Sequence, residues 1–287
     1  MKIRDILAQR EEGVSFEFFP PKTAVGREGF MKTIHELAGY GPLFISVTCS
    51  PGSITHERTV NAITWIRQET ELTVMPHLTC IAATQSSIDA VLSNYIQLGI
   101  ENILALRGDP PRDVSDVSRG NGAFSHAMDL VVFVKKFNAL SIAVAVYPEG
   151  HSESPDLEKD IEFTKMKVDA GADFALTQMF FDNAYFYAYL DKARKTGITI
   201  PILPGIMPVT DCRKVEEFAA FCKATIPEQL RKKMHPYLDR PEEMRKIGIE
   251  HAVNQCDDLR ANGVKYLHFY TMNRAGVVSS ILNSLKK

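Results

Sequence analysis

The sequence predicts an α/β fold, a single (β/α)8 barrel of the TIM type that spans residues 1–287. Short apolar segments alternate with amphipathic helical segments along most of the chain, which is the pattern of a parallel sheet covered by helices. A glycine separates several of these helices from the strand that follows. Eight such units in one chain of this length are typical of a closed barrel. A doubly wound open sheet is the alternative, and no linker divides the chain into two domains.

Glycine ends four of the predicted helices, at Gly99, Gly171, Gly197 and Gly263. A glycine after the last helical residue adopts the left-handed conformation at little cost and stops the helix. The segment after each of these glycines is short and almost wholly apolar. Such segments are expected where both faces of a parallel sheet are covered.

Apolar runs and helical periodicity place the elements in order. The predicted strands are 14–19, 44–48, 73–78, 102–106, 142–147, 174–178, 202–206 and 266–270. A buried helix face is predicted by the spacing of Ile88, Val91, Leu92, Tyr95 and Ile96. The interval before the last strand is longer than the others. It contains an extra charged helical insertion around residues 225–243.

Composition excludes several classes of protein. The chain is 45% hydrophobic and 24% charged with a net charge of −2, which indicates a globular protein rather than a nucleic-acid binder. Apolar runs such as 140–147 are too short to cross a bilayer, and residues 1–13 lack the apolar core of a signal peptide. The five cysteines form no Cys-x-x-Cys pair. We therefore expect free thiols, a cytoplasmic location, and neither nucleic acid nor membrane as a partner.

The segment 14–22 carries one acid, Glu17, in a β-prone run that two prolines stop. A carboxylate among three phenylalanines is costly to keep charged, so this acid is expected to hold its proton near neutral pH. That is what a general acid requires. The alternative is an edge strand with the carboxylate in solvent, and the segment alone leaves both open.

Polar residues collect where the predicted strands end. The C-terminal ends of all barrel strands meet at one rim, where barrel enzymes carry their active sites. The rim residues, in chain order, are Glu17, Thr48, His77, Arg107 with Gly108 and Asp109, Tyr147 with His151, Gln178, Gly205 and Arg274. Every predicted strand thus contributes to one prospective site.

Arg107 is the strongest indication of a ligand site among these residues. It follows an apolar strand directly and must lie at least partly buried. A buried guanidinium needs an anion, and a phosphate suits it. Gly108 would let the backbone approach such a ligand closely. Structural roles remain open for the others: Asp109 could cap a turn, His77 could be a core histidine, and Gln178 could bond a neighbouring strand.

Several nucleotide and hydrolase motifs are absent from the sequence. No G-x-G-x-x-G follows a strand, and neither a Walker A sequence nor a Gly-x-Ser-x-Gly elbow occurs. No His-Glu pair has zinc-protease spacing. The segment 77–80 pairs a histidine with a cysteine but lacks a second ligand pair, so no metal is expected.

Seven segments, in order, resemble the bacterial methylenetetrahydrofolate reductase family. They are 15–22, 76–80, 104–109, 168–172, 177–182, 204–208 and 268–274. Together they cover nearly the whole chain and are highly specific, although the Asp-Ala-Gly-Ala turn at 169–172 is common in barrels.

The resemblance implies a barrel that binds FAD at its strand C-termini. The flavin contacts would be Thr48, His77, Arg107, Gly108, Asp109, Ala145, Tyr147, His151, Asp160 and Lys167. The folate contacts would be Gln178 and Arg274, with Phe218 stacking on bound ligands, unless Phe218 belongs to an ordinary buried helix face. Three residues depart from the family pattern. His126 stands for a tyrosine, Phe163 for a polar residue and Lys214 for a glutamine.

The resemblance also implies the reaction, in which NAD(P)H reduces the flavin and the flavin reduces 5,10-methylenetetrahydrofolate to 5-methyltetrahydrofolate by ping-pong hydride transfer through N5. The product would supply methyl groups for methionine synthesis. Glu17 would protonate N10 of the folate, and Asp109 would tune the flavin. A homo-oligomer is expected, without a C-terminal regulatory domain and hence without S-adenosylmethionine control. The sequence does not decide between NADH and NADPH.

Two other functions compete with this interpretation. A Schiff-base aldolase would need a lysine within a strand, and only Lys265 lies at the margin of one. A flavin- or folate-binding subunit of a larger electron-transfer complex would need a partner for its reduction.

Overall fold

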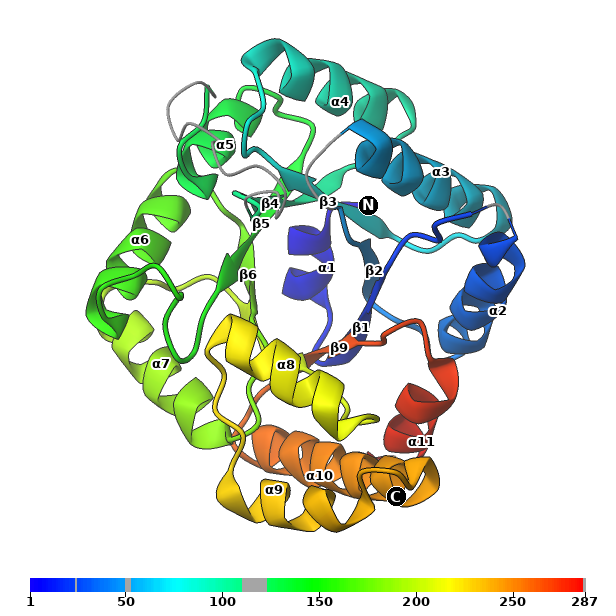
Figure 1. Cartoon of the computed structure of the whole chain (residues 1–287). Coiled ribbons are helices and arrows are strands. Elements are labelled where there is room, and N and C mark those ends of the chain that lie inside the picture. The colour runs from blue at the N-terminus through cyan, green and yellow to red at the C-terminus, as the bar shows by residue number, and fades with distance from the viewer. Residues whose placement is uncertain (24, 50–52, 110–122, 286–287) are drawn as a thin grey trace.

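The computed structural model describes residues 1–23, 25–49, 53–109 and 123–285, and only the backbone of 53–55. Its strands form one parallel barrel with helices around the outside (Figure 1). Neighbouring strands follow the order β7-β6-β5-β4-β3-β2-β1-β9-β8. The predicted (β/α)8 barrel is therefore confirmed, and the doubly wound alternative is wrong.

The strands begin and end within two residues of their predicted bounds. They are β1 Gly13–Phe18, β2 Phe44–Val47, β3 Val74–Thr79, β4 Asn102–Leu106, β5 Ser141–Val146, β6 Phe174–Thr177, β7 Ile202–Leu203, β8 Gly205–Ile206 and β9 Tyr266–Tyr270. The helices are α1 Ile3–Gln9, α2 Gly26–Ala38, α3 Ser53–Glu69, α4 Gln85–Gln97, α5 Ala127–Val134, α6 Leu157–Asp169, α7 Asn183–Lys195, α8 Cys212–Cys222, α9 Glu228–Met234, η1 His235–Tyr237 (a 3-10 turn), α10 Pro241–Ala261 and α11 Ala275–Leu285.

The predicted strand 202–206 is in fact two short strands, which corrects the sequence-based boundary. β7 pairs with β6 and β8 pairs with β9, so this one segment closes the barrel by bonding to both neighbours. Pro204 lies between them. Because proline has no N–H to donate, the ladder breaks at this residue.

Local signals mark both ends of several helices, and the predicted glycine stops are confirmed. The four glycines that end helices have positive φ, from 70° at Gly99 to 116° at Gly171. Helices α6, α7 and α8 each begin after an aspartate whose carboxylate accepts a backbone N–H of the first turn. Both kinds of cap satisfy backbone groups that the helix ends leave unpaired.

Helix α1, which the sequence analysis missed, seals the N-terminal end of the barrel. Its apolar residues, Ile3, Ile6 and Leu7, pack inside the barrel against a layer from six strands and the residue before β2: Leu43, Phe44, Met75, Leu104, Ala143, Phe174, Leu176 and Leu203. The i, i+3, i+4 spacing of these three residues was the available signal.

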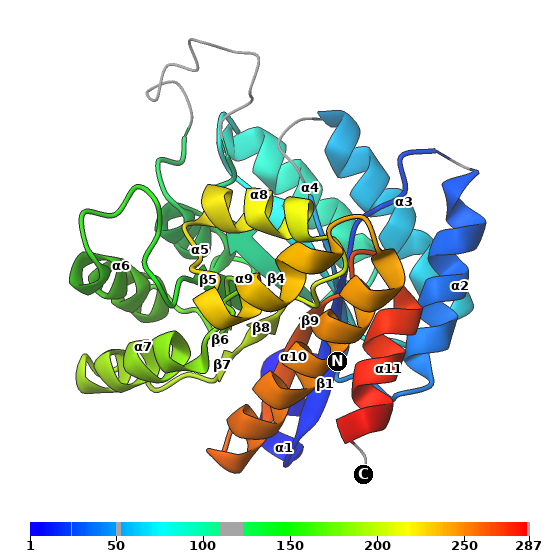
Figure 2. The same cartoon turned by 60° about the horizontal axis from the view of Figure 1, so that its bottom comes forward.

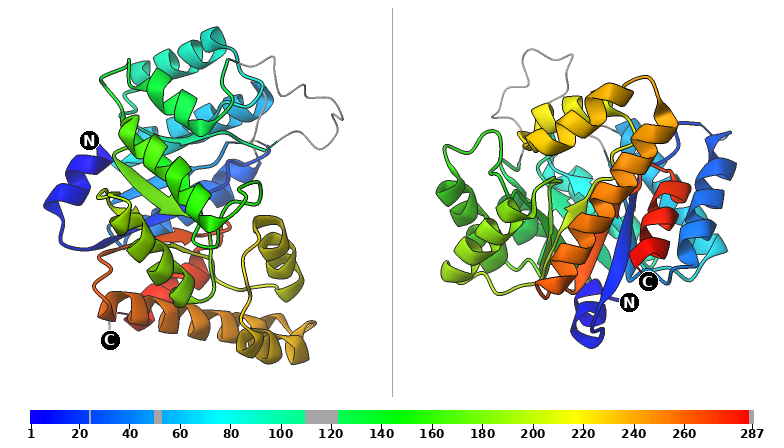
Figure 3. Two further views of the ribbon diagram at one scale, coloured as in Figure 1. Left: turned by 90° about the vertical axis from the view of Figure 1, so that its left-hand side faces the viewer. Right: turned by 90° about the horizontal axis from the view of Figure 1, so that it is seen from below.

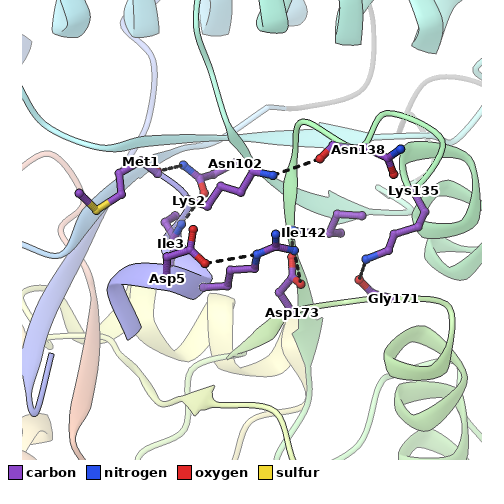
Figure 4. A network of polar contacts seen from close by, with 11 residues as sticks. Met1, Lys2, Ile3, Asp5, Asn102, Lys135, Asn138, Ile142, Gly171 and Asp173 are labelled. Atoms are coloured by element: carbon purple, nitrogen blue, oxygen red, sulfur yellow. Dashed lines mark hydrogen bonds and ion pairs between the residues drawn. The ribbon is translucent and has the colours of Figure 1, made fainter. Parts of the chain in front are cut away.

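Polar contacts hold α1 and the nearby loops in place (Figure 4). The buried side chain of Asn102 accepts the Ile3 N–H at 2.7 Å and donates to the Met1 carbonyl at 3.0 Å. Asp173 accepts the Ile142 N–H at 2.8 Å. The floor of the barrel is thus tied to β4, β5 and the turn before β6.

The opposite end of the barrel carries α8 (Figures 2 and 3). The predicted charged insertion, 225–243, corresponds to α9, η1 and the start of α10. Two hydrogen bonds connect this region to the loop after β5. Glu149 accepts the Thr225 N–H, and Lys223 Nζ donates to the Ser152 carbonyl at 2.8 Å. Within the described residues, no helix combines the length and apolar character that crossing a membrane requires.

Gly248→Ala is expected to destabilise the protein by at least about 2 kcal/mol, because overpacking against a fixed backbone is costly. Gly248 is buried in α10, and a Cβ there would lie 1.7 Å from the carbonyl oxygen of Val209. The matched control is Gly29→Ala in α2, where a Cβ meets nothing within 4 Å. This control should gain roughly 0.5–1 kcal/mol from helix propensity. Urea unfolding measures both, and equal stabilities would contradict the close contact.

Candidate active site

Two cavities lie at the C-terminal rim of the barrel. The Glu17 cavity, about 130 Å³, is lined by Glu17, Phe19, Gln178, Met179, Met207, Phe218, Tyr270, Thr271 and Met272. The Arg107 cavity, about 560 Å³, is lined by Ala105, Leu106, Arg107, His126, Ala127, Met128, Ala145, Tyr147, His151, Glu153, Ser154, Pro155, Asp160, Phe163, Met166 and Lys167. Of the predicted rim residues, Glu17 and Gln178 line the first cavity, and Arg107, Tyr147 and His151 line the second.

The alternation of side chains along β1 sends Glu17 into the barrel. Phe16 and Phe18 point the other way, into the core between the sheet and the helices, and Phe19 is 44% exposed. β1 lies between β2 and β9, so the edge-strand alternative is wrong. Phe16 and Phe18 are therefore not the environment of this carboxylate, whereas Phe19 lines the same cavity.

Two histidines face Glu17 instead. His77 Nε2 of β3 lies 3.3 Å from Glu17 Oε2, and His268 Nε2 of β9 lies 3.5 Å from the same oxygen. Ser15, also on β1, places its Oγ 2.8 Å from His268 Nδ1. The side chains of Glu17, His77 and His268 are 12%, 7% and 0% exposed, respectively. We call these three residues the Glu17 cluster.

The cluster overturns the expectation that Glu17 holds its proton near neutral pH. Burial raises the pKa of Glu17, but the facing imidazoles of His77 and His268 lower it more, and the net pKa is about 2. In this arrangement the carboxyl is an anion.

Tyr270 of β9 forms part of the wall of the Glu17 cavity. Its hydroxyl donates to the Thr177 carbonyl at 2.6 Å. Burial raises the pKa of Tyr270 well above its ordinary value, and the charges of Glu17 and Tyr147 add to this effect. Gly205 packs against the same tyrosine, and a Cβ at this glycine would lie 2.6 Å from the ring. The barrel can close here only because that position has no side chain.

The Arg107 cavity contains two cationic side chains. Arg107 makes a bidentate ion pair with Glu153, at 2.5 and 3.0 Å, so the anion expected from sequence is in this structure a carboxylate of the loop after β5. Lys167 of α6 is half-buried and donates to the Ala145 carbonyl at 2.6 Å. Burial lowers the pKa of Lys167 to about 8, although Asp160 opposes this shift.

Aromatic side chains complete the Arg107 cavity. Tyr147 and His151 pack edge to face, with ring centroids 4.6 Å apart. Burial raises the pKa of Tyr147, and the carboxylates of Asp160 and Asp109 add to this rise. His126 and Phe163, the two departures from the family pattern near the flavin, also line this space. The cavity thus combines cations with flat, apolar walls.

The remaining predicted residues lie outside both sets of lining residues. Asp109 is exposed after β4, close enough to Arg107 to raise its pKa. Thr48 follows β2, and its carbonyl accepts from the Thr59 hydroxyl. Arg274 donates to the Thr210 hydroxyl at 3.2 Å, and Lys214 is 3.9 Å from the Asp211 carboxylate. Residues 110 and 111, the two prolines after Asp109, lie outside the described residues.

Gly108 and Phe218 have distinct local surroundings. Gly108 has a φ of +86°, and a Cβ there would lie 3.0 Å from Thr79. Phe218, on α8, is 37% exposed and lines the Glu17 cavity, whereas Val215 and Ala219 form the buried face of that helix. The interpretation of Phe218 as an ordinary buried residue is therefore wrong.

Sequence reasoning missed Ser15, His268 and Glu153 as site residues. For Ser15 and His268 the available signal was the period-two alternation of β1 and β9, which sends both side chains to the interior with Glu17. Glu153 lies in a loop, and no local pattern identified it as the partner of Arg107.

Comparisons with known proteins support a common family. The sequence matches the family model described as Methylenetetrahydrofolate reductase over residues 2–286. It is 38% identical over 279 residues to 5,10-methylenetetrahydrofolate reductase of Escherichia coli (strain K12), covering 96% of this chain and 92% of that protein. It is 39% identical over 292 residues to Methylenetetrahydrofolate reductase 1 of Schizosaccharomyces pombe, covering 99% of this chain but 48% of that protein. The chain thus spans about half the length of the fungal and plant relatives.

Solved structures share the fold at low sequence identity. An uncharacterized protein from Clostridium thermocellum that binds two copies of 5-methyl-5,6,7,8-tetrahydrofolic acid has a TM-score of 0.67 at 12% identity, covering 100% of this chain and 98% of that one. Dihydropteroate synthase from Vibrio fischeri ES114 has a TM-score of 0.53 at 14% identity, covering 96% and 94%. These likenesses concern the barrel alone.

Glu17→Gln is expected to lower the free energy of unfolding at neutral pH, with a loss that shrinks as the pH falls from 4.5 toward about 2. The folded-state pKa lies below the ordinary value of 4.5, so the unfolded chain takes up the proton first. The stabilisation is present above 4.5 and is lost across that interval. Urea unfolding at a series of pH values measures the difference. Equal stabilities at neutral pH would instead indicate a protonated carboxyl.

Proposed function

This chain belongs to the methylenetetrahydrofolate reductase family, and from that membership we propose that it reduces 5,10-methylenetetrahydrofolate to 5-methyltetrahydrofolate with FAD and NAD(P)H. The observation that carries the proposal is the pairing of two cavities at one rim. One holds Glu17 with Gln178, and the other holds Arg107 with Lys167. An acid–base cluster beside a cationic, aromatic cavity suits a folate that meets a flavin nucleotide.

The Arg107 cavity fits FAD by the chemistry of its donors. Arg107 pairs with a carboxylate in a bidentate manner, and a phosphate can replace that carboxylate. Lys167 adds a second cation. Tyr147, Phe163 and Met166 offer flat or apolar surface to ring systems. The residues proposed to hold FAD are Thr48, His77, Arg107, Gly108, Asp109, Ala145, Tyr147, His151, Asp160 and Lys167.

Bound FAD would supply the hydride transfer between the nicotinamide and the folate. The protein's own residues would handle the proton. We assign to Glu17 the protonation of N10 of the folate, with the proton drawn from the cluster that it forms with His77 and His268. Because the pKa of Glu17 is about 2 in this arrangement, Glu17 must first take up a proton before it can act as the acid. Ser15 orients the His268 ring through its contact with Nδ1.

Positioning of the folate would fall to three residues around the Glu17 cavity. Gln178 lines the cavity and uses its side-chain oxygen to accept the Met179 N–H, which fixes the carboxamide. Phe218 presents its ring from α8, where a pterin or nicotinamide can stack. Arg274 would pair with a carboxylate of the folate. Asp109 would tune the charge around the flavin from its exposed place beside Arg107.

The cellular setting follows from the same proposal. All five cysteines are free thiols, which fits a reducing cytoplasm. We propose a cytoplasmic homo-oligomer whose product supplies methyl groups for methionine synthesis. None of the described strands contains a lysine, so a Schiff-base aldolase with its lysine on a strand is not supported.

Glu17→Gln is expected to retain FAD binding and reduction by NADH but to lose folate turnover by about 10²–10⁴-fold, the usual contribution of a general acid. The amide keeps the size of the carboxyl but cannot pass a proton to N10. Bleaching of the flavin absorbance by NADH measures the first half-reaction, and oxidation of NADH with methylenetetrahydrofolate measures turnover. Glu12→Gln, at an exposed site, is the control.

Three outcomes would contradict the proposed function. A colourless protein that takes up no FAD would remove the cofactor. Flavin that NADH alone fails to reduce would favour the subunit of a larger electron-transfer complex. Normal turnover in Glu17→Gln would remove Glu17 from the acid role.

FAD binding is expected to weaken about tenfold between pH 7 and pH 9, because only about one tenth of Lys167 stays protonated one unit above its pKa. That pKa is about 8, and the charged form attracts the phosphates. Lys167→Met should remove most of this pH dependence, whereas Lys165→Met, at an exposed ion pair on the same helix, should keep it. Quenching of FAD fluorescence by the apoprotein measures the affinity. The same pH profile in both variants would exclude Lys167 as the phosphate-facing cation.

A further inference from the structure

A group of metal-ligand side chains lies at the first turn of α8, and none of them is among the lining residues of either cavity. Cys212 begins that helix and Glu216 follows one turn later on the same face. His235 begins the 3-10 turn η1, and its Nε2 lies 3.0 Å from Glu216 Oε1. The thiol sulfur, one carboxylate oxygen and one imidazole nitrogen all lie within 4.8 Å of one another.

These three ligand types favour one class of cation. Thiolate and imidazole are the ligands that zinc and its borderline neighbours prefer, and a carboxylate completes a common mixed set. Magnesium and calcium would instead require mostly oxygen ligands. Two short helical elements supply the ligands, so the site needs no distant loop to close over it.

We propose that Cys212, Glu216 and His235 bind a zinc ion, with water as the fourth ligand. Three protein ligands and one open position are a known four-coordinate arrangement for this metal. The three ligands differ in their exposure to solvent. Cys212 is 1% exposed, whereas the side chains of Glu216 and His235 are 35% and 50% exposed. Water therefore has access from the side of the imidazole and the carboxylate.

Two groups compete with the metal, and both can give way. Arg231 Nε lies 3.7 Å from Glu216 Oε1, but this arginine also reaches Glu228 at 4.0 Å and is 46% exposed. Its guanidinium can therefore turn to the second carboxylate. Burial, with the charges of Glu216 and Asp211, raises the pKa of the Cys212 thiol. Metal binding must release that proton, so affinity rises with pH.

The bound ion would link α8 to the insertion that follows it. Cys212 and Phe218 lie on the same helix, and Phe218 lines the Glu17 cavity. A metal at the first turn would fix this helix against η1 and steady that wall of the cavity. This inference does not depend on the reaction assigned to the cavities.

Cobalt replaces zinc as a visible probe in the test. The tag-free full chain, kept reduced by a non-chelating agent, is titrated with Co²⁺. We expect a sulfur-to-cobalt charge-transfer band together with the intense visible bands of a tetrahedral site, and zinc should remove both. Cys212→Ser should abolish the charge-transfer band. His235→Gln changes a half-exposed side chain, so the variant should still fold. It should weaken cobalt binding at least about tenfold, because even the loss of an outer-shell partner costs that much and His235 is a direct ligand.

Matched cysteine variants separate this site from other thiols. Cys222→Ser lies on the same helix, outside the group, and should keep the charge-transfer band. Cys49→Ser removes a thiol that lies 3.6 Å from His56 Nδ1 and should also keep it. The proposal is overturned if no charge-transfer band appears, if His235→Gln binds cobalt unchanged, or if Cys49→Ser rather than Cys212→Ser abolishes the band.

Discussion

The parallel register of β1 between β2 and β9 is the constraint on which the site depends. In this register Ser15 and Glu17 face the barrel interior and Phe16 and Phe18 face the helices. A shift by one residue would reverse every side chain, placing the carboxylate among the helices and the aromatic rings in the barrel. Burying two phenylalanines against the helices therefore also fixes the direction of the acid.

The fold was readily predicted from the sequence because its signals are local. Glycines after helices, helical periodicity and uninterrupted apolar strands each act within a few residues, and together they indicated eight units of a parallel barrel. The failures have equally physical causes. Pro204 divides a continuous apolar run because it cannot donate to a ladder. Helix α1 is short, and its apolar face is buried only by strands that come later in the sequence.

The site was predicted less completely because its chemistry depends on contacts between distant segments. The rim rule brought Glu17, Arg107 and Gln178 to one end of the barrel. It could not indicate that β3 and β9 would each place an imidazole beside the carboxylate, which reverses the direction of the pKa shift expected from the neighbouring phenylalanines. Nor could it show that Glu153 would occupy the guanidinium of Arg107.

The barrel closes at the two short strands β7 and β8, on either side of Pro204. Elsewhere, strands of four to six residues share long ladders, whereas β7 and β8 contribute two residues each. The barrel is held at this point by few backbone hydrogen bonds and by the packing of Gly205 against Tyr270. Local opening should therefore begin beside the Glu17 cavity, where amide hydrogens exchange soonest, while the remainder of the cylinder stays closed. The weakest part of the scaffold thus borders its most reactive part.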